Sequence, residues 1–282
     1  MKKNKISLSK NIMNKKKLKV CLIQIEGKET PKLNSKLLKK YLIKSLKFTP
    51  DIIFTPECLN VITSNKNHLK RVVTTQNNCP VLNECKNFAK EHNIFVSVGS
   101  LLLKQNNSEK LLNRSFFINN KGKIISYYDK IHLFDVNINK KETHQESKIF
   151  KKGNKIVAVN SPWGKFGLTI CYDIRFPLLY RKLVKLGCRF LLIPAAFTVP
   201  TGKAHWKILL QSRAIENTCY IIAAAQCGKH HGSRKTYGHS SIIDPWGQAI
   251  LEASTKPGIF SKTLDLELIN SVRLKIPSIY IN

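Results

Sequence analysis

The chain of 282 residues is 43% hydrophobic, which is enough for a substantial core, but no apolar run approaches the roughly 18 residues that a membrane helix requires. Its formal net charge is +31 at pH 7, and the excess is mostly Lys, spread along the whole chain together with many Asn and Ile, while Arg is scarce. Because Arg is the residue that binds phosphates and bases bidentately, we interpret the charge as the composition of an A+T-rich genome and predict neither a nucleic-acid nor a membrane partner.

The chain begins with a basic, polar segment that lacks the apolar centre of a secretory signal, so we predict a disordered tail over 1–17 and a folded domain over 18–282. In chain order, the hydrophobic patterns then predict a strand at 18–25, a helix at 34–46, a strand at 51–55, a helix at 81–91, a strand at 94–103 and a hairpin at 113–128. They continue with an irregular loop at 136–155, a strand at 166–170, a helix at 176–186, a strand at 190–196, a helix at 205–217 and strands at 220–225, 237–243 and 249–252. Strands alternate with helices and no linker interrupts them, which favours one domain of mixed sheets with helices on the outer faces.

The eight cysteines are not spaced as C-x-x-C pairs or zinc fingers. Several lie in apolar strand-like runs, so we predict reduced thiols and a cytoplasmic protein. The adjacent pair His230 and His231 lacks the spacing and the carboxylates of a typical metal site. We therefore predict no metal and no cofactor.

Three residues that could carry chemistry lie directly beyond predicted strands. Glu57 follows the strand at 51–55, Lys130 follows the hairpin and Cys171 follows the strand at 166–170. Taken singly, Glu57 could cap a helix, Lys130 could be a surface charge and Cys171 could be a buried core thiol. Reactive groups are nevertheless common at the carboxyl ends of strands in layered α/β folds, because ligands bind there.

The segments around these residues are similar, in the same order, to the three signature segments of the nitrilase superfamily of carbon–nitrogen hydrolases. They read FTPECLN, YYDKIHLFDV and GLTICYDIRFPLLYR, and the similarity continues in PAAFTVPTGKAHW, LLQSRAIENTCYIIAAAQCGKHH and YGHSSIIDPWG. The resemblance covers residues 18–277. It implies a four-layer α-β-β-α sandwich and a homodimer.

The resemblance also implies a role for each residue in cutting a small carboxamide into an acid and ammonia. Cys171 is the expected nucleophile and Glu57 the expected general base and acid, because a thiolate needs a nearby base or cation at neutral pH. Lys130 and the backbone N–H of Tyr172 are expected to stabilise the oxyanion, and water then hydrolyses the thioester. The family has a second glutamate near the site, and Glu146 in HQESKIF stands at the matching place.

Within the superfamily, the segments AHW, RAIE, AAAQCGKHH and YGHS most resemble the branch of deaminated-glutathione amidases, which are metabolite-repair enzymes. The first alternative is an ω-amidase that acts on α-ketoglutaramate-like monoamides, and the second is a carbamoyl-amine hydrolase. A non-enzymatic alternative is a binding or scaffold protein that has kept the fold and lost the chemistry. We also expect Asp173 and Arg175, directly after the nucleophile, to brace its turn by hydrogen bonds.

Overall fold

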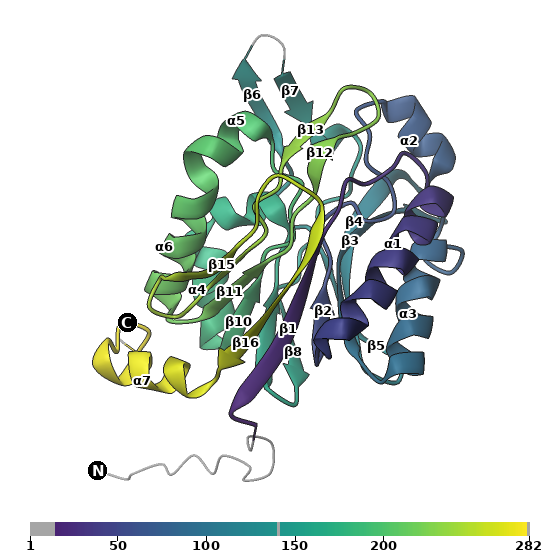
Figure 1. The fold of residues 1–282 in the computed structure, drawn as a ribbon. Helices are drawn as coiled ribbons and strands as arrows, with labels where there is room; N and C mark the ends of the chain where they lie inside the picture. The colour runs from purple at the N-terminus through teal and green to yellow at the C-terminus, as the bar shows by residue number, and fades with distance from the viewer. Residues whose placement is uncertain (1–14, 140–141, 281–282) are drawn as a thin grey trace.

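The computed structural model describes residues 15–139 and 142–280, which contain two six-stranded sheets lying face to face (Figure 1). The first sheet has the spatial order β16 (Gly258–Asp265), β1 (Lys17–Gln24), β2 (Ile52–Phe54), β3 (Phe95–Gln105), β4 (Ser108–Ile118) and β5 (Ile124–Asp129). The second has the order β15 (Ala249–Glu252), β14 (Ser241–Ile243), β11 (Tyr220–Ala223), β10 (Cys188–Leu192), β9 (Gly164–Leu168) and β8 (Val157–Ser161). The strands are parallel at the centre of each sheet and antiparallel toward its edges.

Helices cover the outer face of each sheet (Figure 1). The helices α1 (Pro31–Ser45) and α3 (Pro80–His92) pack on the first sheet, and α4 (Pro177–Lys185) and α6 (Lys207–Asn217) pack on the second. The short helix α2 (Lys66–Val72) and the late helix α7 (Glu267–Lys275) lie outside these layers. The predicted fold class, a four-layer α/β sandwich with mixed sheets flanked by helices, is confirmed.

Apolar side chains of the strands fill the space between the two sheets. All residues of β10 are buried, as expected for a strand with both faces covered. The rings of Phe166 and Phe190 stack with centroids 4.4 Å apart, and Phe117 packs against Phe166 at 5.2 Å. This rigid layer fixes the positions at which the strands end, and the candidate site lies beyond those ends.

Four local predictions differ from the structure. The segment predicted as an irregular loop contains a hairpin of β6 (Asp135–Asn139) and β7 (Glu142–Gln145). Only two apolar residues alternate with polar ones in the sequence of β6, and β7 contains none. The strand predicted at 237–243 is divided into two strands, β13 (Lys235–Tyr237) and β14. The division occurs because Gly238 and His239 take positive φ values of 74° and 55°. β13 pairs with β12 (Cys227–Lys229). The helix predicted from 205 begins earlier, with α5 (Val199–Thr201) and a π-helical turn (Gly202–Trp206). The sequence pattern also missed α2, β8, β12, β16 and α7.

The expected tail falls mostly outside the described residues, which begin at Lys15, and the first strand begins at Lys17. Across 15–139 and 142–280, none of the helices combines the length and the apolar character needed to cross a membrane.

Candidate active site

The ends of three strands bring the three predicted residues into one cavity. Glu57 follows β2 and Cys171 follows β9, and both strands belong to the parallel centres of their sheets, so their carboxyl ends lie at matching edges. Lys130 follows directly after β5, and its backbone N–H donates to the Asn113 carbonyl at 3.0 Å. The cavity, of about 10 Å³, is lined by Glu57, Lys130, Phe134, Glu146, Cys171, Tyr172, Ala196, Phe197, Thr198, Thr201 and Arg234.

The Glu57 carboxylate is held by donors from three distant segments. Its Oε1 accepts from Lys130 Nζ and from Asn113 Nδ2, both at 3.0 Å, and its Oε2 accepts from the Ala196 backbone N–H at 2.8 Å. Burial raises the pKa of this carboxyl, but the charge and hydrogen bond of Lys130 outweigh burial, so the net pKa is lowered. Glu57 is therefore ionised and able to accept a proton.

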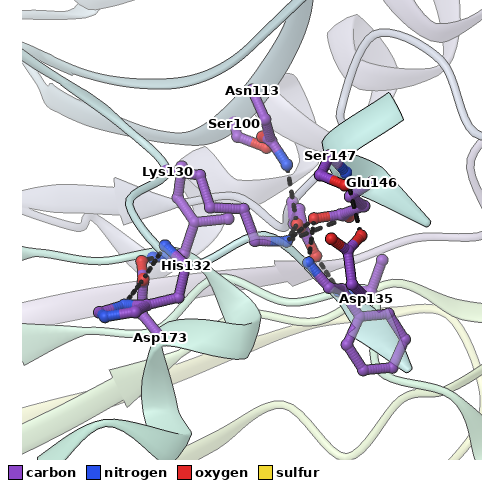
Figure 2. A network of polar contacts seen from close by, with 12 residues as sticks. Ser100, Asn113, Lys130, His132, Asp135, Glu146, Ser147 and Asp173 are labelled. Carbon is purple, nitrogen blue, oxygen red and sulfur yellow. Dashed lines mark hydrogen bonds and ion pairs between the residues drawn. The ribbon is translucent and has the colours of Figure 1, made fainter. Parts of the chain in front are cut away.

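Lys130 is a buried ammonium between two carboxylates (Figure 2). Its Nζ lies 3.0 Å from Glu57 Oε1 and 2.9 Å from Glu146 Oε2, and the Lys130 side chain is only 1% exposed. Burial lowers its pKa, but the charges of Glu146 and Glu57 raise it well above the usual value. Its three N–H donors match three contacts, with Glu57 Oε1 and with both oxygens of Glu146, so a substrate oxygen would have to share or replace the longest of them, at 3.2 Å to Glu146 Oε1.

Glu146 is fixed from two sides. Its Oε2 also accepts from the Phe134 backbone N–H at 2.9 Å, and the side chain lies next to the hairpin that the sequence pattern missed. Glu146 thus holds the ammonium group of Lys130 from the side opposite Glu57. Figure 2 shows Asn113, Lys130 and Glu146 converging on this cluster.

Cys171 has a backbone conformation that is rare for a residue with a side chain. Its φ is 48°, in the left-handed region, which costs about 1–2 kcal/mol outside glycine, and its N–H donates to the Pro194 carbonyl at 2.9 Å. Burial raises the pKa of its thiol, the nearby Glu57 carboxylate raises it further, and Lys130 lowers it only in part. The resting site therefore holds a protonated thiol beside an ionised carboxylate.

A buried carboxylate joins the segment that carries Lys130 to the turn that carries Cys171 (Figure 2). Asp173 Oδ2 accepts from the Ile170 backbone N–H at 2.8 Å and from the Tyr128 hydroxyl at 2.7 Å. Its Oδ1 accepts from the His132 backbone N–H at 3.1 Å and contacts His132 Nδ1 at 2.7 Å. The expected brace at Asp173 is present.

The expectation for Arg175 is not met. Its guanidinium contacts His205 Nδ1 at 3.2 Å and lies over the ring of Phe197 at 5.5 Å, so it packs beside the cavity and does not brace the turn.

Several contributors to the site were missed by sequence reasoning. Asn113 was predicted only as the start of a hairpin, and the Ala196 N–H is a backbone group that no residue type reveals. Arg234 was not singled out, although it lines the cavity and its charge lowers the pKa of Glu57. Among the described residues, no group of three or more His, Cys, Asp or Glu side chains is arranged to hold a metal ion.

Comparisons with known proteins identify the family of the chain. The sequence profile of the carbon–nitrogen hydrolase family matches residues 19–274. The deaminated glutathione amidase of Dictyostelium discoideum is 39% identical over 280 residues, which cover 95% of this chain and 94% of that protein.

Two solved structures share the fold. The NitFhit protein of C. elegans has a TM-score of 0.89 at 33% identity, and the match covers 96% of this chain and 66% of the NitFhit chain. Nit3 of Saccharomyces cerevisiae, a member of branch 10 of the nitrilase superfamily, has a TM-score of 0.84 at 28% identity, and the match covers 93% of this chain and 95% of Nit3.

Proposed function

The chain belongs to the carbon–nitrogen hydrolase family and is an amidase that acts on carbon–nitrogen bonds other than peptide bonds, and we propose that it hydrolyses deaminated glutathione through a thioester on Cys171. The observation that carries the mechanism is the buried Glu57–Lys130–Glu146 cluster in the same cavity as the thiol. It supplies a base, a cation and a nucleophile within one enclosed space.

In the proposed acylation, Cys171 Sγ attacks the amide carbon while Glu57 accepts the thiol proton. The carbonyl oxygen becomes an oxyanion, which accepts hydrogen bonds from the Lys130 ammonium and the Tyr172 backbone N–H. The C–N bond then breaks as Glu57 gives its proton to the departing nitrogen. This step leaves a thioester and restores the Glu57 carboxylate.

In the proposed deacylation, Glu57 removes a proton from a water molecule that attacks the thioester carbon. The second oxyanion has the same donors, and its collapse expels the Cys171 sulfur, which regains the proton from Glu57. Glu146 keeps the Lys130 ammonium in place through both steps. Its two contacts with Nζ, at 2.9 and 3.2 Å, support this role.

The substrate proposal rests on the curated relatives, which are named deaminated glutathione amidases. Deaminated glutathione contains no primary amide, so the expected product ammonia is wrong for this substrate: its hydrolysis releases an amine. Ammonia is the product from a primary amide such as α-ketoglutaramate. The two compounds carry the same acyl group. Because the two compounds differ only in the leaving group, comparing their rates distinguishes the proposed function from the ω-amidase alternative.

We expect the purified enzyme to hydrolyse deaminated glutathione with a kcat/KM at least about tenfold above that on α-ketoglutaramate, a difference of about 1.4 kcal/mol in transition-state binding. Mass spectrometry of the shared acid product measures both reactions in the same units. A higher kcat/KM on α-ketoglutaramate would identify an ω-amidase instead, and activity only on a carbamoyl amine would favour the third candidate.

The pH dependence of the reaction should be unusually flat. The lowered pKa of Glu57 keeps the base ionised, and the raised pKa values of Cys171 and Lys130 keep both groups protonated. We expect kcat/KM to vary by no more than about twofold between about pH 5.5 and about pH 9. Initial rates in overlapping buffers measure this profile, and a steep limb near neutral pH would indicate that a different group acts as the base.

The directions in which the pKa values of Glu57 and Lys130 shift also determine how their ion pair affects stability at different pH values. Because the pKa of Glu57 is lowered on folding, its stabilisation is present above the unfolded carboxyl pKa and is lost as the pH falls through the folded value. Because the pKa of Lys130 is raised, its stabilisation is present below the unfolded amine pKa and is lost as the pH rises through the folded value. Neither contribution changes across the neutral range.

We also propose that the protein is a cytoplasmic homodimer that binds neither nucleic acid nor membranes. The predicted tail is too long at its end, because Lys17 pairs with Asp265 in the first sheet. The scarcity of Arg within a charge of +31 supports the absence of a nucleic-acid partner. Size-exclusion chromatography with light scattering tests the dimer, and titration with DNA and RNA near 0.15 M salt tests the absence of nucleic-acid binding.

A further inference from the structure

A second and larger cavity lies beside the catalytic one. Its volume is about 160 Å³, against about 10 Å³ for the cavity that contains the thiol. The two cavities share Phe134, Glu146 and Arg234 as lining residues, so they are direct neighbours. The catalytic cavity alone has room for little more than one water-sized group. The neighbouring cavity has room for a larger part of a substrate.

The second cavity lies on the side of the general base. Its lining includes Asn113, which donates to Glu57 Oε1, Cys58, which follows Glu57 in the chain, and Glu146. The departing nitrogen of an amide must face Glu57, because that residue protonates it. A group attached to this nitrogen therefore extends toward the second cavity.

Two cations line the second cavity and form no ion pair with a carboxylate among the described residues, although the charge of Arg234 acts on Glu57 in the neighbouring cavity. Lys66 is the exposed first residue of α2 and makes no ion pair there. Arg234 contacts the Ala196 carbonyl at a long 3.4 Å, and its Nε is buried with no hydrogen-bond partner. Glu146 is the single carboxylate among the described residues that line this cavity, and its charge is paired with Lys130. Lys130 and Arg234 together offset the charges of Glu57 and Glu146, so Lys66 adds a positive charge that no carboxylate in the lining offsets.

Apolar side chains form the rest of the wall. Leu69, Leu102 and Phe150 line the cavity and belong to a buried cluster, so they can contact the aliphatic part of a ligand. A small apolar wall that leads to two cations suits a short amine that ends in a carboxylate.

We propose that this second cavity is the leaving-group subsite and that it binds the amine side of a secondary amide, with Lys66 and Arg234 contacting a terminal carboxylate. The proposal rests on the proposed amidase function and specifies its substrate class. It predicts that the enzyme prefers N-substituted amides with an anionic amine over primary amides of the same acid.

The test uses two substrates with one acyl group, deaminated glutathione and α-ketoglutaramate, and the variant Lys66→Gln. Lys66 lines only the second cavity, so the variant should lower kcat/KM on deaminated glutathione about tenfold and leave α-ketoglutaramate unchanged within about twofold. Lys70→Gln, an exposed lysine of the same helix that does not line the cavity, is the matched control and should change neither value. Deaminated glutathione with its terminal carboxylate amidated should react about tenfold more slowly with the wild type and show no further loss with Lys66→Gln.

The possible results separate the proposal from the function on which it rests. Equal losses on both substrates, or no loss on either, would overturn the subsite while leaving the amidase intact. An undiminished rate on the amidated substrate would overturn it too, because no carboxylate would then be recognised. Failure of the wild type on both substrates would instead contradict the proposed function, and the subsite with it. Circular dichroism and urea unfolding of each variant establish that the fold is unchanged.

Discussion

Replacing Cys171 with Ala is expected to reduce kcat by at least about 10⁴-fold, because no other group in the cavity can form the thioester. The substitution removes only the sulfur and keeps the Cβ, so the turn at φ 48° and its hydrogen bond to Pro194 should persist. The measurement is single-turnover hydrolysis of deaminated glutathione followed by mass spectrometry. The wild type should show an acyl-enzyme mass shift on Cys171 that the variant lacks.

The matched control is Cys188→Ala, which removes another buried thiol from strand β10. Its pKa is raised to about 12 by burial and it lies in the core, so the variant should lose about 1 kcal/mol or more of stability and retain near-normal turnover. Normal turnover by Cys171→Ala would reject the thioester mechanism. A comparable loss in the control would show that the effect reflects folding and not the nucleophile.

Replacing Lys130 with Met is expected to lower both activity and stability. Loss of the oxyanion donor should reduce kcat about 10²- to 10³-fold, and loss of the cation leaves Glu57 and Glu146 as neighbouring carboxylates without compensation. Removing one partner of a buried ion pair typically costs about 3–5 kcal/mol. Without Lys130 the pKa of Glu57 should rise, because burial then dominates.

The direction of this change in the Glu57 pKa can be tested by measuring the stability of the variant at two pH values. A raised Glu57 pKa destabilises the folded state above that pKa, so Lys130→Met should recover part of its lost stability between about pH 7 and about pH 5, where the wild type should not. Urea unfolding at the two pH values measures the difference. Lys148→Met, an exposed lysine two residues beyond Glu146, is the matched control and should behave as the wild type. An equal response in both variants would contradict the charge-pair interpretation.

The candidate site could be predicted in part because its main residues are local features of the sequence. Glu57 and Cys171 stand directly beyond short apolar strands, and the carboxyl ends of parallel strands meet at one edge of a sheet. The alternation of buried strands and amphipathic helices likewise predicted the layered fold, because hydrophobic periodicity depends on which faces are covered. The hairpin of β6 and β7 escaped this method, since the apolar alternation in β6 is limited to two residues and β7 contains no apolar residue.

The sequence by itself therefore determined the layered α/β class, the strand-end positions of Glu57, Lys130 and Cys171, and the family resemblance that connects them. The tertiary structure alone decided the electrostatic state of the site. The donors to Glu57 come from residues 56 and 139 positions away in the chain, and burial keeps the Cys171 thiol protonated at rest. These properties depend on distances through space and on exclusion of water, which no local pattern of residues encodes.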